Sequence, residues 1–169
     1  ASKGFGNQDR DIVRAIMDAG KGLALVVNKW DIIDKDTFTM KNFIDEIEYR
    51  FMAMQHYPKL FISVKNNIRL QSVLDEAIRI YDTRREKIRT SDLNNFIAKA
   101  TTQYPPPGVK GKHLKIKYIT QVHHSPPIFA FYTNYPDLFP ISYKRYLENQ
   151  LRKFFDLNGV PIRISFRHK

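Results

Sequence analysis

Two short apolar segments constrain the first half of the chain most strongly. Residues 23–28 and 59–63 read LALVVN and KLFIS, and a helical spacing of apolar residues from Met40 to Met54 separates them. Helical patterns also precede and follow this unit, over 7–19 and 70–81. Short continuous apolar strands alternating with helices are typical of a parallel sheet covered by helices. The order α-β-α-β-α therefore predicts the rear part of an α/β domain with a parallel sheet and flanking helices.

The second half has a different order of elements. A helical pattern from Thr90 to Tyr104 is followed by predicted strands over 113–122 and 128–134, a helix from Ser142 and a closing strand over 160–169. This α-β-β-α-β order predicts a small α+β domain. The charged passage 82–90 lies between the two patterns, so we predict domains over 1–85 and 86–169.

The positive charge lies in the second half alone. Residues 1–82 contain 12 Lys and Arg and 12 Asp and Glu, whereas residues 83–169 contain 16 and 5, a net charge of +11. Such an excess favours a polyanionic partner such as RNA. A solubilising surface and a docking face for an acidic neighbour are the alternatives.

Two absences exclude classes of protein. The sequence contains no cysteine, which excludes disulfides and thiolate metal sites. No apolar run approaches the roughly 20 residues that cross a bilayer. We therefore expect a soluble, cytoplasmic protein without membrane partners.

The tetrapeptide NKWD, residues 28–31, follows the first predicted strand. Ligands of parallel sheets bind beyond the carboxyl ends of the strands. The carboxylate of Asp31 only accepts hydrogen bonds, so it suits the two adjacent N–H groups of guanine and not the acceptor of adenine. The stem of Lys29 can lie over the base, and Asn28 can contact the base or brace a neighbouring loop. The alternative is a turn cap beside a solvated lysine.

The second predicted strand also ends in polar residues. Ser63, Val64 and Lys65 follow it in FISVKN. We expect these residues beside the same base, where their backbone N–H groups can meet the guanine carbonyl oxygen.

Several strings together resemble a known family. They are NKWD, FISVKN, KGKHLKIKYITQ, PPIFAFYTN, SYKRYLENQLRKFF and GVPIRISF. They are similar to the C-terminal part of the bacterial tandem GTPase family EngA, also called Der. The resemblance implies the end of a second P-loop-type GTPase domain followed by a KH-like domain, with a role in assembly of the large ribosomal subunit and contact with rRNA. It also implies that Asn28, Lys29, Asp31 and residues Ser63 to Lys65 recognise the guanine of GTP or GDP.

The residues that bind phosphate have no counterpart in these 169 residues. No G-x-x-x-x-G-K-[ST] motif occurs, and no D-x-x-G precedes the first predicted helix. The resemblance implies that the phosphate- and Mg²⁺-binding parts, and an upstream GTPase domain in contact with this chain, precede Ala1. We expect that the chain alone does not hydrolyse GTP. An RNA-binding or interaction module without GTPase activity is the alternative.

The predicted strands of the second half suggest a basic face. Alternation places Lys115 and Lys117 on one side of a strand, and Arg163 and Arg167 on one side of another. Phe129 and Phe131 alternate with their neighbours and were expected to join this face. The face suits RNA, or docking of a GTPase domain. His123 and His124 indicate a turn rather than a metal site.

Overall fold

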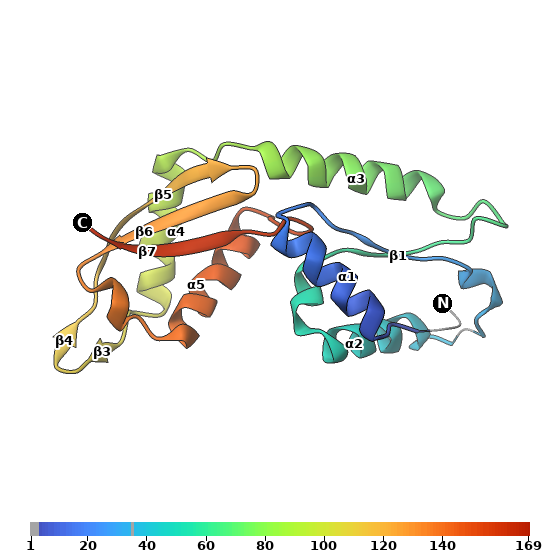
Figure 1. The fold of residues 1–169 in the computed structure, drawn as a ribbon, viewed down its shortest axis with the longest axis horizontal. Helices are drawn as coiled ribbons and strands as arrows, with labels where there is room; N and C mark the ends of the chain where they lie inside the picture. Colours follow the sequence, from blue (N-terminus) through green and yellow to red (C-terminus); the bar gives the residue numbers. More distant parts are fainter. Residues whose placement is uncertain (1–3, 35) are drawn as a thin grey trace. The chain divides into compact units, whose positions relative to one another are not determined.

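The computed structural model describes residues 4–34 and 36–169 (Figure 1). The remaining residues, 1–3 and 35, belong to the predicted first domain and lie outside the described part. The chain forms two compact units. Unit 1 contains the residues up to Thr83 together with the segment Asn158–Pro161, and unit 2 contains Arg84–Leu157 and Ile162–Lys169.

Unit 1 has the predicted order of helices and strands. Its elements are α1 (Asn7–Asp18), β1 (Leu25–Val27), α2 (Thr39–Arg50), β2 (Lys59–Phe61) and α3 (Leu70–Arg85), with short 3₁₀ turns at Trp30–Ile32 and Met52–His56. The strands β1 and β2 pair in parallel, with Leu25 opposite Lys59 and Val27 opposite Phe61. The predicted parallel pairing is confirmed.

Apolar side chains of the helices pack against the two strands. One buried cluster combines Phe5 and Val13 with Ile47, Met54 and Tyr57. A second cluster contains Val27, Trp30 and Phe61. Partly buried residues of β1 and α2 contact both clusters, so one continuous apolar layer supports the strand ends.

The segment Asn158–Pro161 completes unit 1 from a distant part of the chain. The backbone N–H of Leu23 donates to the carbonyl of Gly159 at 2.8 Å, and the N–H of Gly159 donates to the carbonyl of His56 at 2.8 Å. Nη2 of Arg79 also donates to the carbonyl of Asn158 at 3.0 Å. The predicted second domain, 86–169, includes this segment. The hydrogen bonds that tie the segment to unit 1 are made by its backbone, and side-chain patterns do not reveal such bonds.

We predict that Gly159→Ala destabilises unit 1. Gly159 has φ +79°, and an added Cβ would lie 2.6 Å from Cδ1 of Ile80. Left-handed strain and overpacking together should lower the free energy of unfolding by about 2–4 kcal/mol. Urea denaturation measures this change. The control Gly108→Ala, whose new Cβ meets nothing nearer than 3.9 Å, should change stability by less than about 1 kcal/mol. Equal effects of both substitutions would contradict the packing argument.

Unit 2 contains a three-stranded sheet and two long helices. Its elements are α4 (Thr90–Gln103), β3 (Gly108–Val109), β4 (Lys112–His113), β5 (Ile116–His124), β6 (Pro127–Thr133), a 3₁₀ turn (Pro136–Leu138), α5 (Ile141–Phe154) and β7 (Arg163–His168). The strand order is β5-β6-β7, with β6 antiparallel to β5 and parallel to β7. The predicted α-β-β-α-β order is confirmed, and the small β3–β4 hairpin is an addition to it.

Two tyrosines of α5 donate hydrogen bonds to backbone carbonyls at the C-terminal end of α4. The hydroxyl of Tyr143 donates to the carbonyl of Tyr104 at 2.8 Å, and that of Tyr146 donates to the carbonyl of Ala100 at 3.0 Å. Both carbonyls lie at the C-terminal end of α4, and that of Ala100 also accepts from the backbone N–H of Tyr104 at 3.0 Å. Burial raises the pKa of the Tyr143 hydroxyl above its usual value.

Candidate nucleotide-binding site

The parallel pairing of β1 and β2 brings two loops together. The N–H of Ile62 donates to the carbonyl of Val27 at 2.9 Å, and the N–H of Trp30 donates to the carbonyl of Ile62 at 3.0 Å. These bonds extend the strand contact beyond both carboxyl ends. Residues 28–31 and 63–65 are therefore neighbours in space.

Trp30 anchors the first loop in the core. Its side chain is buried and packs against Phe61 at 4.5 Å and against Phe43 at 5.7 Å between ring centroids. The preceding residue, Lys29, has the left-handed conformation with φ 60°. After this turn the indole of Trp30 is buried, while Asn28 and Lys29 are exposed.

Asn28 joins the two loops. Its Oδ1 accepts hydrogen bonds from the N–H of Lys29 at 2.7 Å and from the N–H of Val64 at 3.2 Å. The side chain of Asn28 therefore connects the two loops, which is one of the two roles predicted for it. The N–H of Val64, expected to face a base, donates to Asn28 in this structure.

Ser63 positions the carboxylate of Asp31. The hydroxyl of Ser63 donates to Oδ1 of Asp31 at 2.5 Å and accepts from the N–H of Asn66 at 3.2 Å. Ser63 is 1% exposed, and its backbone pairs with that of Ile68. A buried hydroxyl bonded on both sides holds one orientation, so Asp31 is fixed by a rigid support. The sequence predicts only a backbone role for this residue, because the position of a hydroxyl opposite Asp31 depends on the parallel pairing of the strands.

A pocket of about 500 Å³ lies between the two loops. The residues that line it are Asn28, Lys29, Asp31, Ile32, Val64 and Lys65. Five of the six residues predicted for guanine recognition are among them, and the sixth, Ser63, holds Asp31 from behind. Ile32 and Val64 are more than half exposed and give the pocket apolar walls. Apolar walls with a few convergent polar groups are typical of small-molecule sites.

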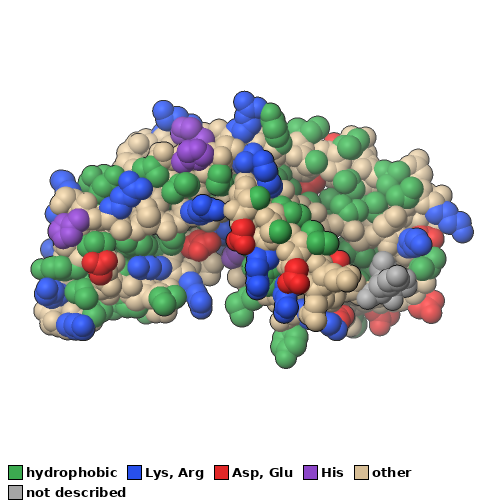
Figure 2. Space-filling view, viewed as in Figure 1, with side chains coloured by type: hydrophobic (Ala, Val, Ile, Leu, Met, Phe, Trp, Pro, Cys, Tyr) green, Lys and Arg blue, Asp and Glu red, His purple; other side chains and the backbone are tan. Residues whose placement is uncertain are grey.

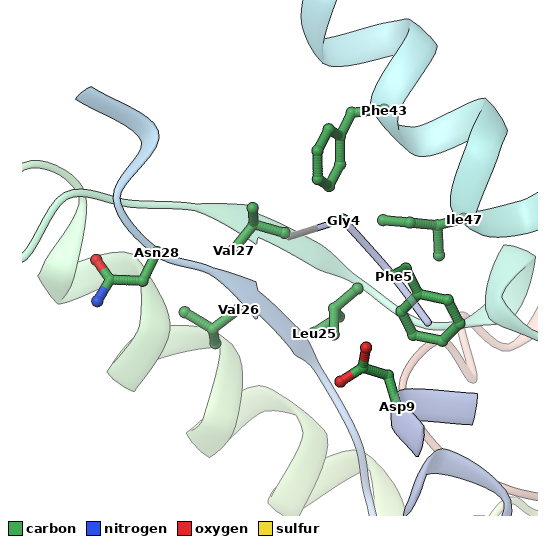
Figure 3. A pocket seen from close by; sticks show the side chains of 9 residues that line it. All are labelled: Gly4, Phe5, Asp9, Leu25, Val26, Val27, Asn28, Phe43 and Ile47. Atoms are coloured by element: carbon green, nitrogen blue, oxygen red, sulfur yellow. The ribbon is translucent and has the colours of Figure 1, made fainter. Parts of the chain in front are cut away.

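A smaller cavity of about 140 Å³ lies beside β1 (Figure 3). Its lining includes Phe5, Leu25, Val27, Phe43 and Ile47. In Figure 3 the amide of Asn28 extends from the end of the strand, away from Phe5. Asn28 is the one residue of NKWD in this lining, whereas Asn28, Lys29 and Asp31 all line the larger pocket, so we assign the candidate site to the larger pocket.

We predict that Ser63→Ala loosens this site. The change removes the donor to Asp31 and the acceptor for the N–H of Asn66, and should lower the free energy of unfolding by about 1–3 kcal/mol. Hydrogen exchange should also become faster at the Asn66 amide. The control is Ser72→Ala, whose exposed hydroxyl donates to the carbonyl of Arg69, and it should change stability by about 0.5 kcal/mol or less. Unchanged Asn66 exchange in the Ser63 variant would contradict the proposed support.

Unit 2 does not present the basic face as predicted. Phe129 and Phe131 are completely buried, so the prediction that they join this face is wrong. Phe131 lies opposite Ile119 and Phe166 in the sheet, and its ring stacks on that of Phe166 at 5.0 Å. Both phenylalanines belong to the core.

An irregularity in β5 explains which aromatic residues replace them. The register shifts between Ile116 and Tyr118, so Tyr118 lies opposite Tyr132, which in turn lies opposite Arg167. Directly opposite residues share a face of a sheet. Tyr118 and Tyr132 therefore accompany Arg167, and strict alternation along the sequence could not show this because a bulge reverses it.

The predicted basic residues of unit 2 are exposed but lie at two ends of its sheet. Lys115, Lys117 and Arg167 lie at the end where β5 begins and β7 finishes, whereas Arg163 lies opposite Ile128 at the other end. His123 lies within β5, opposite Ile128, and not in a turn as predicted; its Nδ1 is 2.9 Å from the carbonyl oxygen of Pro126 in the turn that follows. Of the described helices, none has the length and apolar character that a membrane span needs.

Comparison with known proteins assigns the family. Residues 87–167 match the model of the KH-domain-like region of EngA bacterial GTPase enzymes, C-terminal. The chain is 41% identical over 169 residues to GTPase Der of Amoebophilus asiaticus and 43% identical over 162 residues to GTPase Der of Caldicellulosiruptor saccharolyticus. Residues 87–167 belong to the C-terminal KH-like domain of the EngA family, and the whole chain is similar to GTPases named Der. The alignments cover 100% and 96% of this chain but only 39% and 37% of these relatives, so it corresponds to the C-terminal portion of much longer proteins.

Proposed function

We propose that unit 1 binds the guanine base of GTP or GDP. In this proposal unit 1 is the base-recognising part of a P-loop-type GTPase domain, and the phosphates and Mg²⁺ are held by parts of a longer protein that resemble the rest of such a domain. The observation that carries the proposal is the Asp31 carboxylate, held by the Ser63 hydroxyl at 2.5 Å in a pocket of about 500 Å³.

The chemistry of the pocket favours guanine over adenine. A carboxylate can accept from both N1–H and the 2-amino group of guanine, whereas adenine presents an acceptor at N1. Lys29 lines the same pocket, and its long stem can cover the base plane while the ammonium stays in water. Binding of adenine would leave polar groups of the pocket without hydrogen-bond partners. A site of this kind discriminates strongly between the two bases.

The second unit fits a role on the ribosome. Residues 83–169 carry the entire net charge of +11, and a basic domain binds the phosphates of RNA. We propose that the intact protein acts in assembly of the large ribosomal subunit, with unit 2 in contact with rRNA and with an upstream GTPase domain. The curated relatives are named GTPase Der, which supports a guanine nucleotide as the ligand of the intact protein.

One observation favours a second candidate. No phosphate-binding motif occurs in these 169 residues, so the chain can also be an RNA-binding module whose NKWD loop binds no nucleotide. Titration with nucleotides separates the two candidates, because only the first requires a base-selective pocket.

We predict that the chain prefers guanosine 5′-monophosphate, and that Asp31→Asn changes the preference to xanthosine 5′-monophosphate. The amide can donate to the C2 carbonyl of xanthine, where the carboxylate would be repelled. NMR titration of the Lys29, Val64 and Lys65 amides should give dissociation constants near the millimolar range, with at least a tenfold preference for the matching base. Asp34→Asn, the same change at an exposed neighbour outside the pocket, should retain the guanine preference. Equal shifts with the adenosine nucleotide would contradict the proposal.

We also predict that the chain alone does not hydrolyse GTP. Phosphoryl transfer depends on positioning and charge stabilisation by a phosphate loop and Mg²⁺, and the sequence contains no such loop. A phosphate-release assay with millimolar Mg²⁺ should give the rate of the buffer control. Turnover above that rate, lost in Asp31→Asn, would contradict this expectation.

A further inference from the structure

We infer that one end of the sheet in unit 2 binds single-stranded RNA. This surface, called the sheet-end surface below, consists of the β3–β4 hairpin with Lys115, Tyr118, Tyr135 and Arg167. It lies outside the pocket of unit 1. The inference deepens the ribosomal part of the proposed function and does not depend on nucleotide binding.

The strand topology gathers these residues at one end. Tyr118 lies near the start of β5, opposite Tyr132 near the end of β6, which lies opposite Arg167 near the end of β7. The chain enters β5 from the hairpin through Lys115 and leaves β6 toward Tyr135. Figure 2 shows Lys and Arg side chains over the region that Figure 1 labels β3 and β4.

Asn134 fixes the base of the hairpin. Its Nδ2 donates to the carbonyl of His113 at 2.8 Å, its Oδ1 accepts from the N–H of Lys115 at 2.9 Å, and its own N–H donates to the carbonyl of Lys115 at 3.3 Å. Lys110 and Gly111 at the tip both have positive φ, as tight hairpin turns require. The lysines of the hairpin therefore extend from a rigid support, which lowers the entropy lost on binding.

Aromatic rings accompany the positive charges. The rings of Tyr118 and Tyr132 stack at 4.4 Å, and Nζ of Lys169 lies 5.8 Å from the Tyr118 ring. Nζ of Lys112 lies 4.5 Å from the ring of Tyr135, which is 36% exposed. Tyrosine faces beside ammonium groups can stack bases while the cations hold phosphates.

The charge pattern selects the partner. The sequence from Leu93 to Pro136 contains no Asp or Glu, and it includes the whole hairpin and both ends of the β5–β6 pair. The exposed carboxylate of Asp137 lies just beyond this range, two residues after Tyr135. A polyanion is therefore favoured. Among polyanions, single-stranded RNA offers both phosphates and exposed base faces, whereas duplex RNA hides its base faces and an acidic protein has none.

The test measures RNA affinity of the 169-residue chain without nucleotide. Fluorescence anisotropy of a labelled 12-nucleotide oligouridylate is recorded at several NaCl concentrations. Lys112→Ala/Lys115→Ala is compared with Lys99→Ala/Lys153→Ala, which removes the same charge from exposed positions on α4 and α5. The two double variants are matched, because each removes one lysine that lies over an aromatic ring. Nζ of Lys99 lies 5.3 Å from the ring of Phe154, and Nζ of Lys112 lies 4.5 Å from that of Tyr135.

We expect the hairpin pair to reduce the slope of log K against log[salt] by about 1.4, since each phosphate contact contributes about 0.7 for single strands. The control pair should reduce the slope by no more than a quarter of the reduction caused by the hairpin pair. Tyr135→Leu should weaken binding by about fivefold or more, whereas Tyr49→Leu, at a 91% exposed position of unit 1, should leave it within twofold. Circular dichroism checks that each variant is folded.

Three results would overturn the inference. They are equal losses in the two lysine pairs, an unchanged affinity of Tyr135→Leu, and binding of a duplex or of polyglutamate as tight as that of the single strand. Because this assay contains no nucleotide, its failure leaves guanine binding by unit 1 untouched, and failure of the nucleotide titration leaves the RNA result untouched.

Discussion

The parallel pairing of β1 with β2 is the constraint on which the candidate site depends. Asp31 and Ser63 are 32 residues apart, and Asn28 and Val64 are 36 apart, yet both pairs are hydrogen-bonded. They meet because parallel strands end at the same edge, and the bonds of Ile62 and Trp30 extend the pairing past the last residues of the ladder. Loss of this pairing would separate the loop of residues 28–32 from that of residues 63–65, which together line or support the pocket.

The site also depends on how apolar anchors hold polar groups in place. Trp30 is buried against Phe61, and this packing supports the left-handed turn at Lys29 that would otherwise cost about 1–2 kcal/mol. Ser63 is buried as well, but its hydroxyl is bonded to Asp31 and to the backbone of Asn66. Asp31 and Asn28 are thus held by hydrogen bonds to the second loop, and the pocket is present without a ligand.

The sequence predicted the elements that follow simple periodicities and missed those that break them. The continuous apolar segments identified β1 and β2, and NKWD identified the residues that line the pocket, because strand, loop and chemistry are contiguous there. The bulge beside Lys117 reverses the alternation of β5, so Tyr118 joins the basic residues. Phe129 of β6 is buried in the core, and alternation alone does not show which face of a strand is buried. The return of Gly159 to unit 1 depends on backbone hydrogen bonds and on the space beside Ile80, which no pattern of side chains encodes.

The central claim is that Asp31 recognises guanine, and a crystal structure of the chain with guanosine 5′-monophosphate tests it most directly. We predict that the base lies between the two loops, with N1 and N2 each about 2.7–3.2 Å from an oxygen of Asp31 and with the Ser63 hydroxyl still bonded to that carboxylate. A base bound elsewhere, or one whose N1 and N2 edge faces solvent while Asp31 contacts only protein, would contradict the account.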